Sequence, residues 1–154
     1  MGWIIARKDV KCMKNDIDID ITLPSHTRYL RMVSRIGEKV AEEVDCPEEI
    51  RETLPGQLAV VLTEGLVNAI KHANSTDLNK EIHVRINVSN KVLVVRIYDN
   101  GLGFDLDAVP TPCFTPDGLE EKGRGIFILR SLMDTVKYSR SDGGNVLEMR
   151  KNLA

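Results

Sequence analysis

A stretch of about twenty residues without any periodic pattern constrains the fold of this chain more than any other feature. From Gly101 to Lys122 the sequence is rich in glycine, proline and acidic residues, and patterned segments lie on both sides of it. Loops of this length are uncommon inside a compact domain and are generally either functional or disordered. We therefore predict a lid over a binding site at about residues 101–122.

The composition fits one globular domain and argues against several function classes. With 154 residues and 42% apolar residues, the chain is long enough to bury a core. Its 21 basic and 23 acidic residues nearly balance, which argues against a nucleic-acid-binding protein. The three cysteines form no pattern typical of a zinc site or a disulfide framework. No apolar run resembles a signal peptide or a membrane span, so we expect a cytoplasmic protein without membrane contact.

Apolar residues recur with strand or helix periodicity before the loop. Ile17, Ile19 and Ile21 alternate with polar residues, which predicts a half-buried strand that Pro24 ends. Two amphipathic helices follow, the first of them capped by Ser25. The predicted elements are a strand at 17–23, a helix from Ser25 to Val44, a helical turn at 48–53 and a helix at 57–72.

The remaining elements predict a sheet covered by helices. They are strands at 82–88 and 92–98, a helix at 123–134, and strands at 135–139 and 145–150. This order favours an α+β two-layer sandwich, with the helices on one face of a mixed, mostly antiparallel sheet. Residues 16–154 would form this single domain. Residues 1–15 carry no periodic pattern and are expected to be either a flexible lead-in or the product of a misassigned start.

A row of polar residues on the second long helix is the first candidate site. Glu64, Asn68 and His72 are four residues apart and therefore share one helix face. They could form the solvated stripe of an amphipathic helix. They could also be chemical groups, because an asparagine oxygen suits Mg²⁺ and a carboxylate can accept a proton from an attacking hydroxyl.

Two glycine motifs flank the predicted lid. Asp99-Asn100-Gly101-Leu102-Gly103 follows a strand, where it could be an ordinary turn or a ligand pocket with an accepting carboxylate. Gly123-Arg124-Gly125-Ile126 opens a helix, where it could be a hinge or a phosphate site made by free N–H groups. Each motif is weak evidence when it is taken alone.

The order of these motifs resembles that of the Bergerat ATP-binding fold, which gyrase, histidine kinases and related ATPases share. ExxxN on a helix, DxGxG after a strand, a long loop and GxG at a helix start are similar to its N, G1 and G2 boxes. The resemblance runs from about Ile17 to Arg150. More narrowly, the segment 64–73, Phe114-Thr115-Pro116 and Leu132-Met133-Asp134 resemble the anti-sigma-factor serine/threonine kinases of bacteria.

The resemblance implies a role for each residue of these motifs. Glu64 would be the catalytic base, and Asn68 would bind the Mg²⁺ that bridges the phosphates of ATP. Asp99 would accept a hydrogen bond from the amino group of adenine. The other nucleotide-binding positions that the resemblance implies are His72, Gly101, Gly103, Lys122, Gly123, Arg124 and Gly125.

For function, the resemblance implies an ATP- and Mg²⁺-dependent protein serine/threonine kinase that is also an anti-sigma factor and a homodimer. It would phosphorylate an anti-anti-sigma antagonist protein and sequester a sigma factor. Some relatives carry an arginine before the second glycine box, where this chain has Glu120-Glu121-Lys122, so that role is absent or falls to Lys122 or Arg124. The alternative is an ATP-binding partner switch with little catalysis that sequesters another regulator. A third possibility is a free ATPase or a detached histidine-kinase catalytic domain.

Three arginines of the first helix region are a candidate for partner binding. Arg28, Arg31 and Arg35 are spaced to share one face. Such a face is often only solvated, whereas the resemblance suggests a sigma factor docked near it.

Overall fold

The computed structural model of the chain describes residues 16–72, 80–101, 105–108, 114–115, 118–119, 123–141 and 143–154. The predicted lead-in at residues 1–15 and most of the predicted lid lie outside these ranges, and so do Gly103 and Lys122. The side chain of His72 is not described either.

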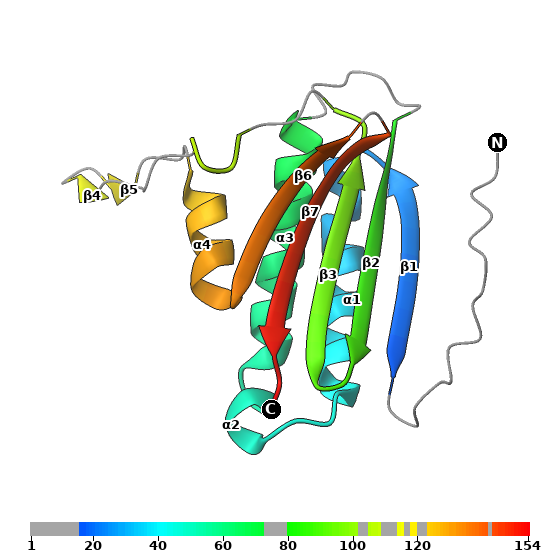
Figure 1. Ribbon diagram of the computed structural model, residues 1–154, viewed down its shortest axis with the longest axis vertical. Helices are drawn as coiled ribbons and strands as arrows, with labels where there is room; N and C mark the ends of the chain where they lie inside the picture. Colours follow the sequence, from blue (N-terminus) through cyan, green and yellow to red (C-terminus); the bar gives the residue numbers. More distant parts are fainter. Residues whose placement is uncertain are drawn as a thin grey trace.

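Five strands form one twisted sheet, and the long helices cover one of its faces (Figure 1). The strands are β1 (Ile17–Pro24), β2 (Glu81–Ser89), β3 (Val92–Asp99), β6 (Thr135–Ser141) and β7 (Gly144–Asn152). They lie in the order β1-β2-β3-β7-β6. The predicted sandwich of helices on a sheet is thus confirmed. Every strand pair among the described residues is antiparallel, so the expected parallel contribution to a mixed sheet is not seen there.

The helices follow the predicted order, with two differences at their starts. They are η1 (Thr27–Tyr29), α1 (Leu30–Glu43), α2 (Glu48–Arg51), α3 (Leu54–His72) and α4 (Arg124–Leu132). Two short strands, β4 (Phe114–Thr115) and β5 (Gly118–Leu119), pair inside the predicted lid, where the sequence indicated no strand.

Ser25 does not cap the first helix, contrary to the prediction. Its backbone N–H donates to the Lys80 carbonyl at 2.9 Å, which ties Ser25 to the end of the sheet. A 3-10 turn then precedes α1, and the His26 ring accepts from the Arg28 N–H at 3.0 Å. His26 therefore caps the 3-10 turn, whereas α1 itself has Tyr29 as its N-cap residue and no side-chain cap.

The second long helix begins three residues earlier than predicted, at Leu54. Pro55 and Gly56 indicated a break, but they lie in the first turn of α3. Proline is tolerated in a first helical turn because its missing N–H would have no helical partner there. The Gln57 N–H already donates to the Thr53 carbonyl at 3.0 Å.

The close approach of α3 to the sheet determines where the polar residues of this helix lie relative to β3. Leu58, Leu62 and Leu66 are fully buried in the core, which also holds Ile97 and other inward-facing strand residues. A Cβ at Gly65 would lie 2.5 Å from Cδ1 of Ile97, so any side chain at this position would force Ile97 to shift. Since Glu64 precedes Gly65 and Asp99 follows Ile97 by two residues, the contact draws the helix motif and the strand motif toward one another.

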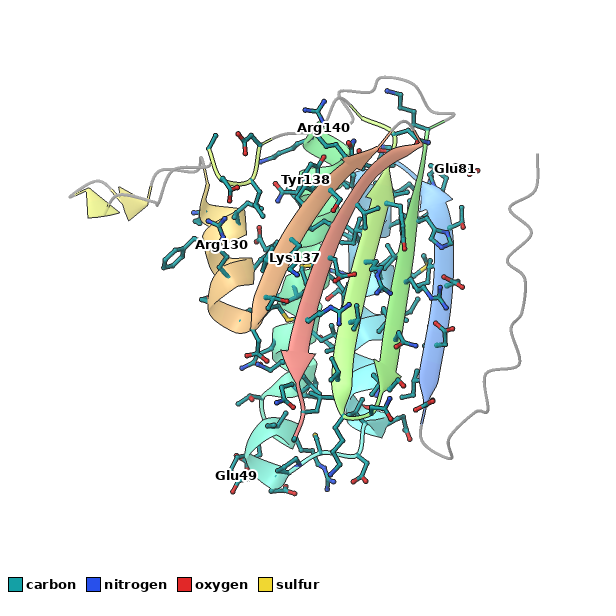
Figure 2. All side chains as sticks on the ribbon, viewed as in Figure 1. Glu49, Glu81, Arg130, Lys137, Tyr138 and Arg140 are labelled. Atoms are coloured by element: carbon teal, nitrogen blue, oxygen red, sulfur yellow. The ribbon has the colours of Figure 1, made fainter. Side chains whose placement is uncertain are left out.

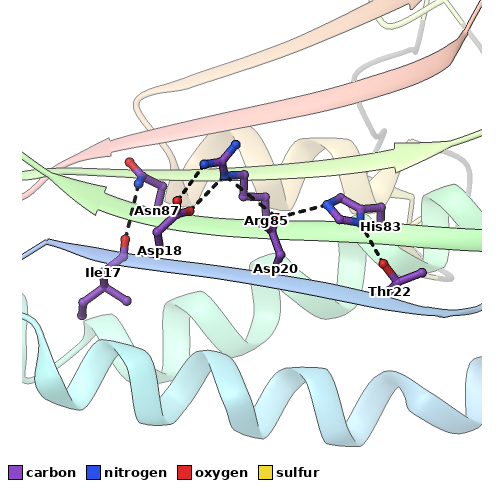
Figure 3. A network of polar contacts seen from close by, with 7 residues as sticks. All are labelled: Ile17, Asp18, Asp20, Thr22, His83, Arg85 and Asn87. Carbon is purple, nitrogen blue, oxygen red and sulfur yellow. Dashed lines mark hydrogen bonds and ion pairs between the residues drawn. The ribbon is translucent and has the colours of Figure 1, made fainter. Parts of the chain in front are cut away.

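The opposite face of the sheet is polar where β1 meets β2 (Figure 3). Arg85 donates two hydrogen bonds to the Asp18 carboxylate, at 2.9 and 2.7 Å. His83 lies between Asp20 and Thr22, at 3.1 and 2.9 Å. Cross-strand pairs of this kind stabilise a sheet whose outer face stays in water.

Candidate functional site

The carboxyl ends of α3 and β3 and the start of α4 lie at one end of the molecule (Figure 1). These three places carry the three motifs that the sequence singles out.

Glu64 of α3 lies against the first turn of α4. An ideal Cβ built on Gly125 would be 2.8 Å from Oε2 of Glu64. The packing of α3 against α4 thus brings the acidic residue of the first motif to the glycines of the third. Among the described residues the Glu64 carboxylate makes no hydrogen bond or ion pair.

The start of α4 has the geometry of an anion site. Gly123 is the N-cap residue with a φ of 86°, and no side chain caps the first turn. The Phe127 N–H donates to the Gly123 carbonyl at 3.0 Å, which leaves the preceding N–H groups without helical partners. The positive end of the helix dipole adds to their attraction for a phosphate. Arg124 is exposed at this position.

Asn68 lies one turn beyond Glu64 on α3. Its side chain is half-buried, and its Nδ2 is fully buried without a hydrogen-bond partner among the described residues. A buried amide without a partner is costly, and one that faces a ligand gains its missing bond on binding. No three His, Cys, Asp or Glu side chains converge in the described ranges. A magnesium ion held mainly by nucleotide phosphates, water and one amide oxygen fits this sparse set of donors.

Asp99 is the buried carboxylate of the site, with 6% of its surface exposed. Its Oδ1 accepts from the Gly101 N–H at 2.8 Å and from Nδ2 of Asn145 at 3.0 Å. Its Oδ2 has no partner among the described residues. One oxygen is therefore held by the protein, and the other remains able to accept a bond from a ligand amino group.

Asn145 belongs to this cluster, and the sequence reasoning missed it. It is 4% exposed and lies directly opposite Asp99 in the β3–β7 register. Its Nδ2 also donates to the Gly101 carbonyl at 2.9 Å, so it holds the turn after Asp99 as well as the carboxylate. A signal was present in the sequence, because Asn145 alternates in step with the apolar Leu147 and Met149. A polar residue in a core register requires a buried partner.

Comparison with known proteins shows which family the chain belongs to. A family model described as the histidine kinase-like ATPase domain matches residues 23–151. The serine-protein kinase RsbW of Bacillus subtilis is 30% identical over 142 residues, which cover 87% of this chain and 86% of that protein. The chain belongs to this family of kinases. RsbW of Listeria monocytogenes is 26% identical and covers 84% of the chain and 83% of its own length.

A solved structure supports the fold. The RsbU and RsbW domains of a Mycobacterium tuberculosis protein match with a TM-score of 0.61 and 14% identity over 89% of this chain. The match spans 32% of that longer chain, about a third. Family membership confirms the predicted resemblance and enzyme class: the chain is a protein serine/threonine kinase of the histidine kinase-like ATPase type, which uses ATP. Within the described ranges no helix is long and apolar enough to cross a bilayer.

Proposed function

We propose that this kinase transfers the γ-phosphate of ATP to a serine or threonine of an anti-anti-sigma antagonist, and that it sequesters a sigma factor as a homodimer. One observation carries the catalytic part. The Glu64 carboxylate lies beside the uncapped start of α4, so a base and a phosphate site are adjacent. The family supports the kinase activity, since the RsbW relatives are named as serine-protein kinases.

Each part of the site has a task in this proposal. The free Oδ2 of Asp99 accepts a hydrogen bond from the adenine amino group. The first N–H groups of α4 bind the terminal phosphates. The acceptor hydroxyl oxygen attacks the γ-phosphorus, the bond to the β-phosphate oxygen breaks and ADP leaves, while Glu64 takes the hydroxyl proton. Arg124 is exposed near the phosphate end and is proposed to add positive charge there.

Asn68 is the residue proposed to hold Mg²⁺ through its side-chain oxygen. Bound at the phosphates, this ion neutralises their negative charge. The buried Nδ2 of Asn68, which lacks a partner among the described residues, is then able to donate to an oxygen of the bound nucleotide. His72, Gly103 and Lys122 remain predictions as further nucleotide contacts.

A groove of about 930 Å³ between β1 and the α1 region supports the partner part of the proposal. Its apolar floor includes Ile17, Ile19 and Met32. Four bases and one acid surround that floor, namely Arg28, Arg31, Arg35, Lys39 and Glu43, so basic residues predominate. We propose that an acidic segment of the sigma factor docks here, with its apolar side chains on the floor.

Two substitutions test the catalytic proposal. Glu64→Gln removes the base but keeps the side-chain volume, so phosphate transfer is expected to fall about 10²–10⁴-fold with ATP affinity kept. Asn68→Ala is expected to lose the Mg²⁺ dependence of ATP binding together with activity. The measurements are ATP affinity with and without Mg²⁺, and phosphate transfer to the antagonist protein. Glu49→Gln, at the far end of the molecule on α2 (Figure 2), is the matched control.

The outcomes separate this proposal from its alternative. Transfer at the wild-type rate by Glu64→Gln contradicts the assignment of Glu64 as the base. A wild-type protein that binds ATP and captures a partner but transfers no phosphate supports the partner switch with little catalysis. The partner switch with little catalysis is tested because the stretch Glu120-Glu121-Lys122 lacks the arginine of some relatives.

A further inference from the structure

The space beside Gly125 is filled by a single group. An ideal Cβ at this position would lie 2.8 Å from Oε2 and 3.9 Å from Cδ of Glu64. Among the described residues no other atom comes within 4 Å of it, apart from neighbours in its own helix. A side chain at position 125 would therefore meet the Glu64 carboxylate before anything else.

The backbone gives no separate reason for a glycine at this position. Gly123 has a left-handed φ of 86°, whereas Gly125 lies inside α4 and has no positive φ. An alanine could adopt the helical conformation there, and it is the better helix former. An alanine would, however, displace the Glu64 carboxylate, because real Cβ atoms do not approach other atoms to 2.8 Å.

The Glu64 carboxylate is free to move if a methyl group at position 125 comes too close to it. Among the described residues it makes no hydrogen bond or ion pair, and it is the far end of a flexible side chain. Its position thus depends on how it packs against α4. A methyl group at position 125 would displace Glu64 and leave the two helices where they are.

We propose that Gly125 is a positioning residue for Glu64: the absence of a side chain there reserves the space in which the base stands beside the phosphate site. The inference rests on the proposed role of Glu64 in phosphate transfer. It assigns Gly125 a task that differs from wrapping the phosphates, because the effect passes through the carboxylate of Glu64.

Gly125→Ala is the direct test, with kinetics and binding measured on the full chain. The kcat for phosphate transfer is expected to fall about 10- to 100-fold, since small misplacements of a reacting group have effects of this size. The melting temperature is not expected to fall, because alanine is the better helix former. Gly56→Ala is the matched control, because a Cβ at Gly56 meets nothing within 4 Å.

The same substitution in a Glu64→Asp background shows whether the effect passes through Glu64. Aspartate is one methylene shorter, so its carboxylate does not reach the new methyl group. Gly125→Ala is then expected to cost less than about twofold in kcat, a non-additivity typical of groups in contact. Equal losses of kcat in both backgrounds, or an unchanged kcat in the single variant, would overturn the inference.

The proposed function fails in a different way. If Glu64→Gln transfers phosphate at the wild-type rate, Glu64 is not the base and the role of Gly125 falls with it. If Glu64→Gln is inactive and Gly125→Ala is fully active, only the positioning role of Gly125 is wrong.

Discussion

The two oxygens of the Asp99 carboxylate lie in different surroundings, and this difference determines what the residue can recognise. Oδ1 accepts two hydrogen bonds from within the protein, from Gly101 and Asn145. Oδ2 accepts none among the described residues. The donors therefore hold the carboxylate through Oδ1 and leave Oδ2 as the oxygen proposed to accept from adenine.

Asp99→Asn is expected to change which nucleotide base the protein prefers. The two donors require an acceptor, so the new amide is expected to place its oxygen toward them and its NH₂ group toward the base. The adenine amino group then meets a donor, and ATP affinity is expected to fall by about 1–3 kcal/mol, or 5- to 150-fold. Inosine triphosphate carries a carbonyl oxygen at that position and is expected to bind the variant better than ATP does.

Titration of both nucleotides against wild-type and variant protein checks this expectation. Asp45→Asn, an exposed acid on the connection between α1 and α2, is the control for the change in charge. If the ratio of the two affinities is the same in the variant and the wild type, Asp99 does not read the base.

For single residues, the sequence was informative where a motif was local. Asp99 and Gly101 lie within three residues, so their pattern could be read directly from the chain. Asn145 lies 46 residues away from Asp99, and only the β3–β7 register brings it opposite. The meeting of Glu64 with Gly125 likewise depends on how α3 packs against α4, which periodicity alone does not fix.

Among the elements, β3 and β7 are joined by charge as well as by their backbone ladder. Glu148 on β7 accepts from Arg96 at 2.7 Å and from Arg150 at 2.8 Å, and 22% of its side chain is exposed. The hydrogen bond from Arg150, followed by that from Arg96, lowers the pKa of Glu148 below its ordinary value of 4.5. These two strands carry Asp99 and Asn145 at their ends, so the contacts of Glu148 stabilise the part of the sheet that holds the candidate site.

The lowered pKa predicts how this link responds to acid. Because the folded pKa lies below 4.5, the link stabilises the fold fully above pH 4.5 and loses its effect as pH falls through the folded pKa. Glu148→Gln is expected to lower the free energy of unfolding by about 0.5–1.5 kcal/mol at pH 7, and by progressively less below pH 4.5. Urea unfolding across this pH range measures the difference. Glu49→Gln changes an exposed residue and is expected to leave the free energy of unfolding unchanged at both pH values. An equal loss of stability in Glu148→Gln at low and at neutral pH would contradict the role of its lowered pKa.

The element boundaries show why sequence patterns misplace helix starts. The pattern Pro55-Gly56 reads as a break, yet proline is compatible with a first helical turn. Ser25 is a good capping residue by type, but the bond of its N–H to Lys80 holds it on the sheet. That partner is 55 residues away in the sequence, so a local pattern could not indicate it.

For the whole molecule, a formal charge of −2 conceals an uneven distribution of charge. Four bases line the groove beside β1, which is an edge strand of the sheet. Helix periodicity predicted that the three arginines among them share a face. It could not predict that Ile17 and Ile19 of β1 would add an apolar floor next to them, since the strand and the helix meet only in the folded chain.

Charge reversal in this groove tests the proposed docking surface for the sigma factor. Arg31→Glu replaces one exposed base of the groove, and capture of the sigma factor is expected to weaken about tenfold or more because like charges then face one another. Lys137→Glu, on β6 at the opposite edge of the sheet (Figure 2), is the matched control and is expected to bind normally. ATP affinity should be unchanged in both variants. Equal losses of sigma-factor capture in the two variants would contradict the docking site. Light scattering gives the mass of each variant. If Arg31→Glu alone falls from dimer to monomer, the groove holds the homodimer interface and not the sigma factor.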